Sequence, residues 1–322
     1  MADPNPSINH HAQEHIIKGS ADEWNALVSS ALGELETRPV DLRRTFSGRL
    51  AHRSLGDLIC VNLRSNRLDV IRQERFISDA REDFFKVNFN LAGTARLEQD
   101  GRQTLLNPGD WVVYDNTRPY RLSFGDDYQQ LVVLVPRSHF LAKLPDIHRL
   151  TVEGQQANSG LGRTAWNYLI GNKTPNDSRT ADIVTDLILG SLLENKKGSP
   201  NFSLSPAAKL VLIKQFIQHH LGDSNLGVEM ICAHMHISRR YLHHLFKIDE
   251  VTVGNYIWQC RLEKTRLDLT SPEANHLTTA EIGYRWGFSS SAHFSRRFKQ
   301  AFGQSPTQHR SSSAVRNSIY LQ

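Results

Sequence analysis

The sequence predicts an α+β protein in which an N-terminal β-barrel with flanking helices precedes an all-α domain that holds two helix-turn-helix motifs. A ten-residue pattern occurs twice in the last third of the chain, at Ser238–Lys247 and Ser290–Lys299. Short apolar segments separated by turn residues fill residues 40–136, and such spacing is typical of a barrel or sandwich. A polar segment rich in Lys, Gly and Pro marks a linker at residues 194–204.

An N-terminal arm and helix are expected over residues 1–39, before the strands begin. The apolar positions of this helix recur at a helical spacing. They are Trp24, Leu27, Val28, Ala31, Leu32 and Leu35.

The segment 40–193 is expected to form one domain. Its strand segments include Asp57–Leu63, the alternating Phe84–Leu91, Trp111–Tyr114 and Gln130–Val135, with a hairpin turn at Gln99–Arg102. The turn Pro108-Gly109-Asp110 followed by an apolar strand resembles the small cupin-like barrel of sugar- and aromatic-sensing regulators. From Ser138 to about Leu193 the pattern turns helical. An apolar stripe near the end of this stretch favours either dimerisation or core packing: Ile183, Leu187, Ile188, Leu192 and Leu193.

The composition is that of a globular protein with an uneven charge distribution. Hydrophobic residues make up 39% and charged residues 22% of the 322 positions. No apolar run reaches the roughly 18 residues of a membrane span, and residues 1–19 lack the layout of a signal peptide. Three cysteines without a C-x-x-C pair predict free thiols in a reducing compartment, so we expect the cytoplasm.

The basic surplus of the chain lies in its C-terminal third. Residues 205–322 hold 14 Lys and Arg against 8 Asp and Glu, whereas the remainder holds 24 against 25. A positive patch on one domain suits an anionic polymer, although a solvated basic face has the same composition. The helical motifs decide between these interpretations.

The first helix-turn-helix lies in the predicted domain 205–311, which opens with an N-cap and helix start at Ser205-Pro206. Val228–His234 is its leading helix, and Cys232 is the small residue where the two helices cross. His236 forms the turn, Ile237 fills the core, and Ser238 caps the second helix. The outward positions of that helix and its end are Arg239, Arg240, His243, His244 and Lys247.

The second motif repeats this plan. Glu281–Trp286 leads, Gly283 is the small residue, Gly287 makes the turn, Phe288 fills the core and Ser289 caps. Its second segment is one residue longer than in the first copy. The outward candidates are Ser291, Ala292, Ser295 and Arg296, with His293 and Lys299 beside them.

A single helix over Gly254–Leu269 has the length to connect the two motifs, and residues 312–322 are expected to form a tail. A stiff connector would hold both reading helices at a fixed separation. Two readers on one side of B-DNA need a separation of about 34 Å.

These residues resemble the AraC/XylS family of bacterial transcription regulators over roughly Leu204–Arg310. The strongest stretches are Glu281–Ser289, His293–Lys299, Phe302-Gly303, Ser305-Pro306 and Arg310. The N-terminal domain resembles the family's AraC-binding-like sensor. Within the family, it is similar to the activator of phenylethylamine and tyramine oxidation. That similarity is carried by Phe89–Gly93, Leu97–Asp100, Gly109-Asp110, Arg118-Pro119 and Leu134–Arg137.

Five positions depart from the family pattern. His236 and Glu250 stand where glycine is usual, and the loop after the first motif is one residue short. His309 replaces a tyrosine, and Cys232 and Gly283 replace alanines. A residue other than glycine at His236 predicts a strained positive φ, so we expect the first copy to be less rigid than the second.

The resemblance implies a transcription activator that binds double-stranded promoter DNA and RNA polymerase, as a homodimer and without contact to a membrane. It places base readers at Arg240, His243 and His244 in the first copy. Arg offers a bidentate pair of donors to guanine O6 and N7, so Arg296 is the strongest reader in the second. Arg239, Lys247, Arg297 and Lys299 suit phosphate contacts. For any one of these arginines, a surface ion pair is the alternative.

The sensor domain is interpreted as ligand-binding and not as an enzyme, with neither cofactor nor metal. A cupin metalloenzyme would need a His-x-His pair, and the barrel segment has only His52. A small aromatic acid or amine is the inducer that the resemblance suggests. The proposed cavity residues are Phe85, Phe89, Trp111, Tyr114, Asp115 and Arg118. The alternatives for the cavity residues are that the aromatic residues are plain barrel core and that Arg118 is a turn residue held by Asp115. The alternatives for the whole chain are control by a protein partner or a metalloenzyme fused to the DNA-binding domain. The residues alone do not distinguish activation from repression.

Overall fold

The protein divides into two compact units, Met1–Ala208 and Lys209–Gln322. The computed structural model describes residues 13–319 apart from 42, 44, 78–82, 157–159, 171–177 and 195–202. Most of the predicted linker 194–204 and the first part of the predicted arm 1–39 therefore lie outside the described residues. The last three residues of the predicted tail lie outside them as well.

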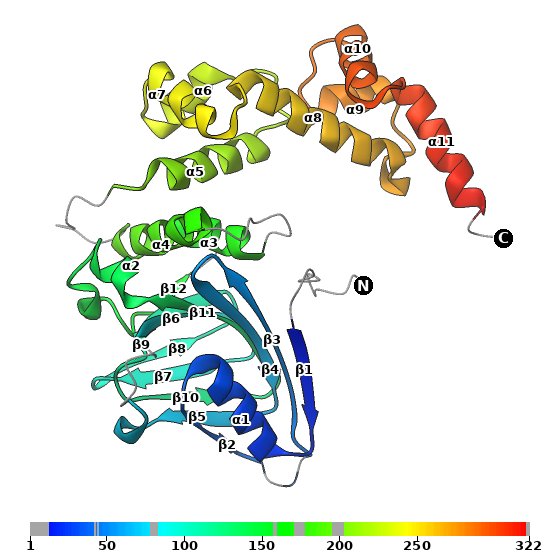
Figure 1. Cartoon of the computed structure of the whole chain (residues 1–322). Helices are drawn as coiled ribbons and strands as arrows, with labels where there is room; N and C mark the ends of the chain where they lie inside the picture. Colours follow the sequence, from blue (N-terminus) through cyan, green and yellow to red (C-terminus); the bar gives the residue numbers. More distant parts are fainter. Residues whose placement is uncertain are drawn as a thin grey trace. The chain divides into compact units, whose positions relative to one another are not determined.

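Two antiparallel sheets form the first unit (Figure 1). In the described residues, the seven-stranded sheet has the order β1 (Gln13–Lys18), β3 (Ser47–Leu55), β4 (Leu58–Ser65), β11 (Tyr128–Pro136), β6 (Phe84–Ala92), β9 (Asp110–Asp115), β12 (Gln155–Gln156). The five-stranded sheet has the order β2 (Glu36–Pro39), β5 (Leu68–Arg72), β10 (Tyr120–Phe124), β7 (Ala95–Gln99), β8 (Arg102–Leu106). The hairpin predicted at Gln99–Arg102 joins β7 to β8.

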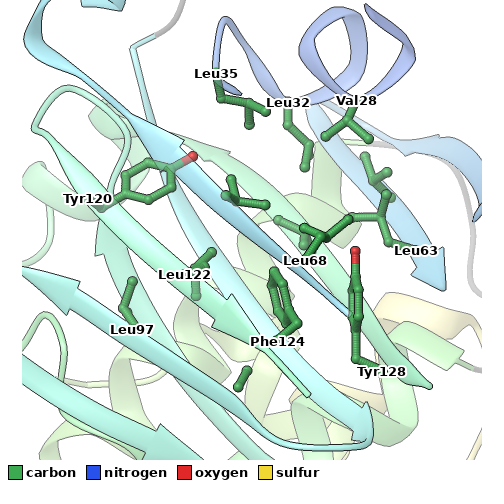
Figure 2. Close-up of a cluster of buried hydrophobic side chains, with 14 of the residues drawn as sticks. Val28, Leu32, Leu35, Leu63, Leu68, Leu97, Tyr120, Leu122, Phe124 and Tyr128 are labelled. Atoms are coloured by element: carbon green, nitrogen blue, oxygen red, sulfur yellow. The ribbon is translucent and has the colours of Figure 1, made fainter. Parts of the chain in front are cut away.

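The apolar core of this unit lies between the two sheets and beneath helix α1 (Ala21–Leu32). Trp24, Val28 and Leu32 of α1 are buried against it, as the helical spacing predicted. Figure 2 shows Val28, Leu32 and Leu35 facing Leu68, Tyr120 and Tyr128 across this core. Other residues of the cluster come from strands of both sheets, among them Leu50, Leu63, Leu97, Val112, Leu122 and Leu134.

The predicted combination of a sheet-rich domain and a helical domain is confirmed, although the two sheets do not close into a barrel. The end strands of each described sheet, β1 and β12 or β2 and β8, do not pair with one another. Alternating polarity specifies which face of a strand is buried. It does not specify whether the edges of a sheet meet, so a sandwich and a barrel have the same sequence pattern.

Three helices follow the sheets: α2 (Arg137–Leu141), α3 (Gly160–Ile170) and α4 (Ser178–Leu193). Helix α4 packs on α3, α2 and β3. Its apolar residues Ile183, Leu187, Ile188 and Leu192 are already buried in the single chain. This stripe is therefore accounted for by packing within one chain, which was the alternative to dimerisation.

The second unit is helical. Its elements are α5 (Pro206–His219, which begins at the end of the first unit), α6 (Val228–Met235), α7 (Arg239–Phe246), α8 (Val253–Thr270), α9 (Thr279–Arg285), α10 (Ser291–Phe302) and α11 (Pro306–Ile319). Helices α6 and α7 form the first predicted motif, and α9 and α10 form the second (Figure 1). The predicted connecting helix is α8. In the described residues, no helix is long and apolar enough to cross a membrane.

Side-chain caps define the starts of the motif helices. The hydroxyl of Ser238 accepts from the backbone N–H of Tyr241, as predicted. Thr278 and Glu281 form a reciprocal capping box at the start of α9. The cap of α10 is Ser290 and not Ser289, because the hydroxyl of Ser290 accepts from the N–H of His293. The extra residue of the second copy therefore lies in the turn.

The first turn carries the positive φ that the sequence predicted. His236 ends α6 in the left-handed region at φ 51°, and Glu250 has φ 55°. The second copy has Gly287 at φ 77° in its turn, where a missing Cβ removes the strain. The three cysteines are unpaired in the structure, as predicted.

We predict that His236→Gly stabilises the protein by about 1 kcal/mol, because the left-handed conformation costs a residue with a Cβ roughly that amount. Thermal unfolding of the full chain measures the change. Ala233→Gly is the matched control, since Ala233 is exposed in α6 and glycine within a helix costs about 1 kcal/mol relative to Ala. Equal destabilisation by both variants would contradict a strained turn.

Candidate functional site

The first recognition helix, α7, presents basic side chains on one exposed face. Its apolar residues Leu242, Leu245 and Phe246 are buried in the core of the first motif. Arg240, His243 and His244 are exposed. This division follows from helical periodicity, since residues three and four apart share a face. The predicted base readers of the first copy are thus free to meet a ligand.

Two further basic residues flank this face. Arg239 makes an exposed ion pair with Glu229 of α6, with 3.1 Å between Nη2 and Oε1. Lys247, directly after α7, is exposed. Within the described residues, neither Arg240 nor Lys247 makes an ion pair or side-chain hydrogen bond, so their charges are available to an anion. Arg239 would have to break its ion pair with Glu229 before it could bind an anion.

The second recognition helix, α10, has a similar face with fewer charges. Phe294 and Phe298 anchor it in the core of the second motif. Of the predicted outward residues, Ser291, Ala292, Ser295, Arg296 and Lys299 are exposed. Neither Arg296 nor Lys299 has a side-chain partner within the described part of the chain. The guanidinium of Arg296 keeps all its donors for a base edge.

Two residues predicted near this face are placed differently. The ring of His293 is half-buried and lies edge-on to Trp258 of α8 at 5.1 Å between ring centroids. Arg297 lies over the Trp258 ring at 5.7 Å. Both side chains support the helix against α8, since aromatic and cation–π contacts of this kind are stabilising. His293 is therefore better described as a packing residue than as a reader.

The predicted ligand-binding aromatic residues do not line one cavity. Phe85, Phe89 and Trp111 lie on the face of the seven-stranded sheet that is turned toward helices, where Phe85 contacts Phe140 of α2 and Phe89 contacts Trp166 of α3. Tyr114 lies on the other face, in the core between the sheets. Successive side chains of a strand point to opposite faces. Because Trp111 and Tyr114 are an odd number of residues apart on β9, they cannot share a face.

The two predicted polar anchors are also used within the fold. Asp115 is buried, and its carboxylate meets Arg137 at 2.6 Å, His148 at 3.4 Å and Arg118 at 3.5 Å. Arg118 itself is exposed and pairs with Asp100 at 2.8 Å. A buried carboxylate requires such partners to offset the cost of desolvation. The prediction that Asp115 and Arg118 anchor a ligand is thus replaced by a structural ion-pair network.

A different polar cluster lies in the core between the sheets. The ammonium of Lys86 donates to the hydroxyl of Tyr120 at 2.8 Å, and the amide of Asn88 donates to Gln130. Lys86 and Asn88 are fully buried. Tyr120 and Gln130 also line a small cavity of about 10 Å³ beneath α1, close to the smallest space that holds one water molecule.

Two polar atoms of the cavity lining have no hydrogen-bond partner in the described structure, the indole nitrogen of Trp24 and the hydroxyl of Thr37. The side-chain oxygen of Asn88, whose amide bonds the lining residue Gln130, has none either. An unsatisfied buried polar group costs about 1–3 kcal/mol. Burial raises the pKa values of the Tyr114 and Tyr128 hydroxyls, which lie in the same core, so both stay neutral. The region offers neutral donors and acceptors together with the buried amino group of Lys86.

Tyr120 connects this cavity to the surface. It also lines an open groove of about 790 Å³ on the outer side, together with buried Arg72 and exposed Arg121. Ligand sites generally have volumes of about 300–1,000 Å³. The inner cavity is far below that range, so a small molecule enters the core only if α1 or Tyr120 moves.

Sequence reasoning missed this cluster because it described only the apolar face of β6 and gave no role to the polar residues on its other face. The segment Phe84–Leu91 alternates as predicted, with Phe85, Val87 and Phe89 on one face. That apolar face lies toward the helices, and the face with Lys86 and Asn88 is turned to the core. One signal was present, since helices predicted after the sheets must cover an apolar face. No three His, Cys, Asp or Glu side chains converge on a possible metal site in the described residues.

Two family models match the chain. An AraC-binding-like domain matches residues 24–171, and a helix-turn-helix domain matches residues 231–312. These matches coincide with the two-sheet unit and with the segment that contains α7 and α10.

Curated relatives match over most of their length. The transcriptional activator NphR of Rhodococcus sp. is 25% identical over 88% of this chain and 87% of its own. An uncharacterised protein in the nit 5′ region of Bacillus sp. (strain OxB-1) is 32% identical over 69% of this chain and 89% of its own. The arabinose operon regulatory protein of Escherichia coli is 24% identical over 70% of this chain and 79% of its own.

A solved structure shares the fold. The AraC-like transcriptional activator CuxR aligns with a TM-score of 0.50 and 19% identity, covering 78% of this chain and 94% of its own. At this identity, the likeness concerns the fold alone.

We predict that Arg296→Ala lowers affinity for a specific DNA site by about 1–3 kcal/mol, the contribution of one bidentate base contact, with little effect on random DNA. Competition binding with a selected duplex and with random duplex measures both affinities. Lys299→Ala is the matched control, because a phosphate contact contributes to both affinities alike. Equal losses on the two duplexes for Arg296→Ala would show that Arg296 contacts only phosphate.

Proposed function

Because the chain belongs to the AraC/XylS family of DNA-binding transcription regulators, we propose that it activates a promoter in response to a small aromatic acid or amine. In this proposal, residues 205–311 bind the promoter and residues 40–193 sense the ligand. Residues 194–204 connect the two. The chain acts in the cytoplasm as a homodimer that contacts RNA polymerase and catalyses no reaction.

The exposed basic faces of α7 and α10 carry the DNA-binding part of this function. Each helix is anchored by buried residues of its own motif core and presents an arginine that no described residue pairs, Arg240 or Arg296. Unpaired arginines on the exposed side of a second motif helix suit the guanine edge in the major groove. The basic surplus of this third of the chain adds attraction to phosphate.

Activation is supported by the relatives. NphR is named a transcriptional activator, and so is the XylDLEGF operon activator of Pseudomonas putida, which is 24% identical over 81% of this chain. Family members are generally not enzymes, and no observation on this chain favours catalysis.

The core between the sheets supports a ligand that combines an aromatic ring with a polar group. Tyr114, Tyr120 and Trp24 supply aromatic surface there, and aromatic rings pack favourably on one another. The ammonium of Lys86, with the hydroxyl of Tyr120, suits a carboxylate. The oxygen of Asn88 and the hydroxyl of Thr37 have acceptor capacity for an amine.

We predict that a matching aromatic acid raises the melting temperature of the full chain by about 5–10 °C at a hundredfold excess over its Kd, because binding to the native state alone adds about 2.7 kcal/mol. A thermal-shift screen of aromatic acids, amines and sugars makes the measurement. Lys86→Met should abolish the shift for an acid, whereas Lys143→Met, outside the cavity, should keep it. No shift with any compound would reject the small-molecule inducer and favour control by a protein partner.

Activation is tested with a reporter gene that is fused to the promoter of the genes next to the one that encodes this chain. We expect its expression to rise when the chain and the inducer are both present and to stay low with Arg296→Ala. A rise in expression on deleting the gene would instead show repression.

A further inference from the structure

The two helix-turn-helix motifs meet at a buried arginine. Arg261 lies near the middle of α8, and only 2% of its surface is exposed. Its Nε donates to the carbonyl of Leu221 at 3.0 Å, and its Nη2 donates to the carbonyl of Asp223 at 2.5 Å. These carbonyls follow the end of α5, and Leu221 belongs to the core of the first motif. Arg261 therefore ties α8 to the first motif.

The turn of the second motif closes on the same point. A Cβ at Gly287 would lie 2.6 Å from Nη2 of Arg261 and 2.7 Å from the carbonyl oxygen of Leu221. A Cβ at Gly222 would lie 2.9 Å from the carbonyl oxygen of Arg285. Distances below 3.0 Å leave no room for a side chain, so the backbone after α5, the guanidinium of Arg261 and the second turn pack directly against one another.

Trp258, one turn before Arg261 on α8, reinforces this junction. The guanidinium of Arg261 lies over the Trp258 ring, 5.1 Å from its centroid. The same ring packs on Phe288 of the second motif, with 5.3 Å between the ring centroids. Trp286 packs in the cores of both motifs and donates to Asp268 of α8 at 2.8 Å. Burial lowers the pKa of Arg261, while the charge of Asp223 opposes that shift. Desolvating a guanidinium is costly, and the two carbonyls are the groups that offset the cost.

We propose that Arg261 is a positioning residue that sets the relative orientation of α7 and α10, and with it the half-site spacing that this protein recognises on DNA. One motif supplies the carbonyls, the other supplies the glycine turn, and Arg261 on the shared helix contacts both. Each base pair inserted between two half-sites rotates one relative to the other by about 34°. A rigid junction therefore rejects an altered spacing, and a loosened junction tolerates it. The inference rests on DNA binding by this domain and not on the identity of the inducer.

Binding of the full chain to a spacing series tests this proposal. The duplexes are a site selected by the wild-type chain from random DNA and derivatives with one or two base pairs inserted or removed between its halves. For the wild type, we expect each altered spacing to lower affinity by about 5- to 150-fold, the value of one lost base reader. Arg261→Met should weaken binding at the native spacing and flatten this profile to within a few-fold.

Two further variants keep the outcome clear. Gly287→Ala places a methyl group against Nη2 of Arg261 and should flatten or shift the profile in the same way, so it decides the question if Arg261→Met does not fold. Arg266→Met is the control, because Arg266 lies on α8 and pairs only with exposed Glu263 in the described structure. Its profile should match the wild type. If Arg261→Met and Gly287→Ala weaken binding by one factor at every spacing, Arg261 stabilises the domain without setting the spacing.

Discussion

The DNA-binding unit depends on one helix that serves two small cores. Val253 and Ile257 in the first half of α8 are buried with the first motif, and Leu262 and Leu269 in the second half are buried with the second. Small cores bury a small share of their surface and are marginally stable alone. Because both motifs pack on α8, each gains apolar surface that its own two helices do not supply. This shared packing also makes the geometry of the two reading helices a property of α8, which spans about 27 Å over its 18 residues.

The two motifs have the same order of helices and turns, but they differ in their helix caps and in the backbone strain of their turns. The second has a capping box at the start of α9 and a glycine in its turn. The first has left-handed backbone at His236 and Glu250, where a side chain adds strain. Strain in a turn is tolerated when surrounding packing determines the conformation, and here the buried face of α7 provides that packing. The first motif therefore carries more backbone strain in its turns than the second, although it presents more basic side chains.

In the first unit, the seven-stranded sheet is covered on both faces, by helices on one side and by the other sheet on the other. This arrangement explains which residues of its strands are aromatic and which are polar. One face of β6 and β9 is covered by helices and is aromatic, through Phe85, Phe89 and Trp111. The other face looks into the space between the sheets and carries Lys86 and Asn88. A strand buried on both faces cannot place polar residues in water, so Lys86 bonds Tyr120 and Asn88 bonds Gln130 within the core. The unsatisfied atoms beneath α1 are a cost that a bound molecule would remove.

Local rules were enough to derive the motif helices of the C-terminal third and the cap of α7. The spacing of apolar residues located α6 to α10, whereas the left-handed turn at His236 was predicted from the resemblance to the family, in which glycine is usual at that position. Local rules also placed the strands of residues 40–136 and the helices that follow them, but they missed β1 and β2, which lie in the segment predicted as an arm and a helix. The cap of α10 moved by one residue, from Ser289 to Ser290, because two adjacent serines offer equivalent caps and only the path of the turn chooses between them.

Tertiary structure alone decided the relations between segments that are distant in sequence. Alternation along β6 defines two faces, but which face meets helices and which meets the other sheet depends on where those elements fold. Asp115 and Arg118 are polar residues near a turn, and only the approach of Arg137 and His148 makes them a structural network. Arg261 reads in the sequence as one more basic residue of a helix. Its contacts with the end of α5 and with the turn at Gly287 are visible only in the folded chain. Contacts between residues that are tens of positions apart do not produce a periodic pattern in the sequence.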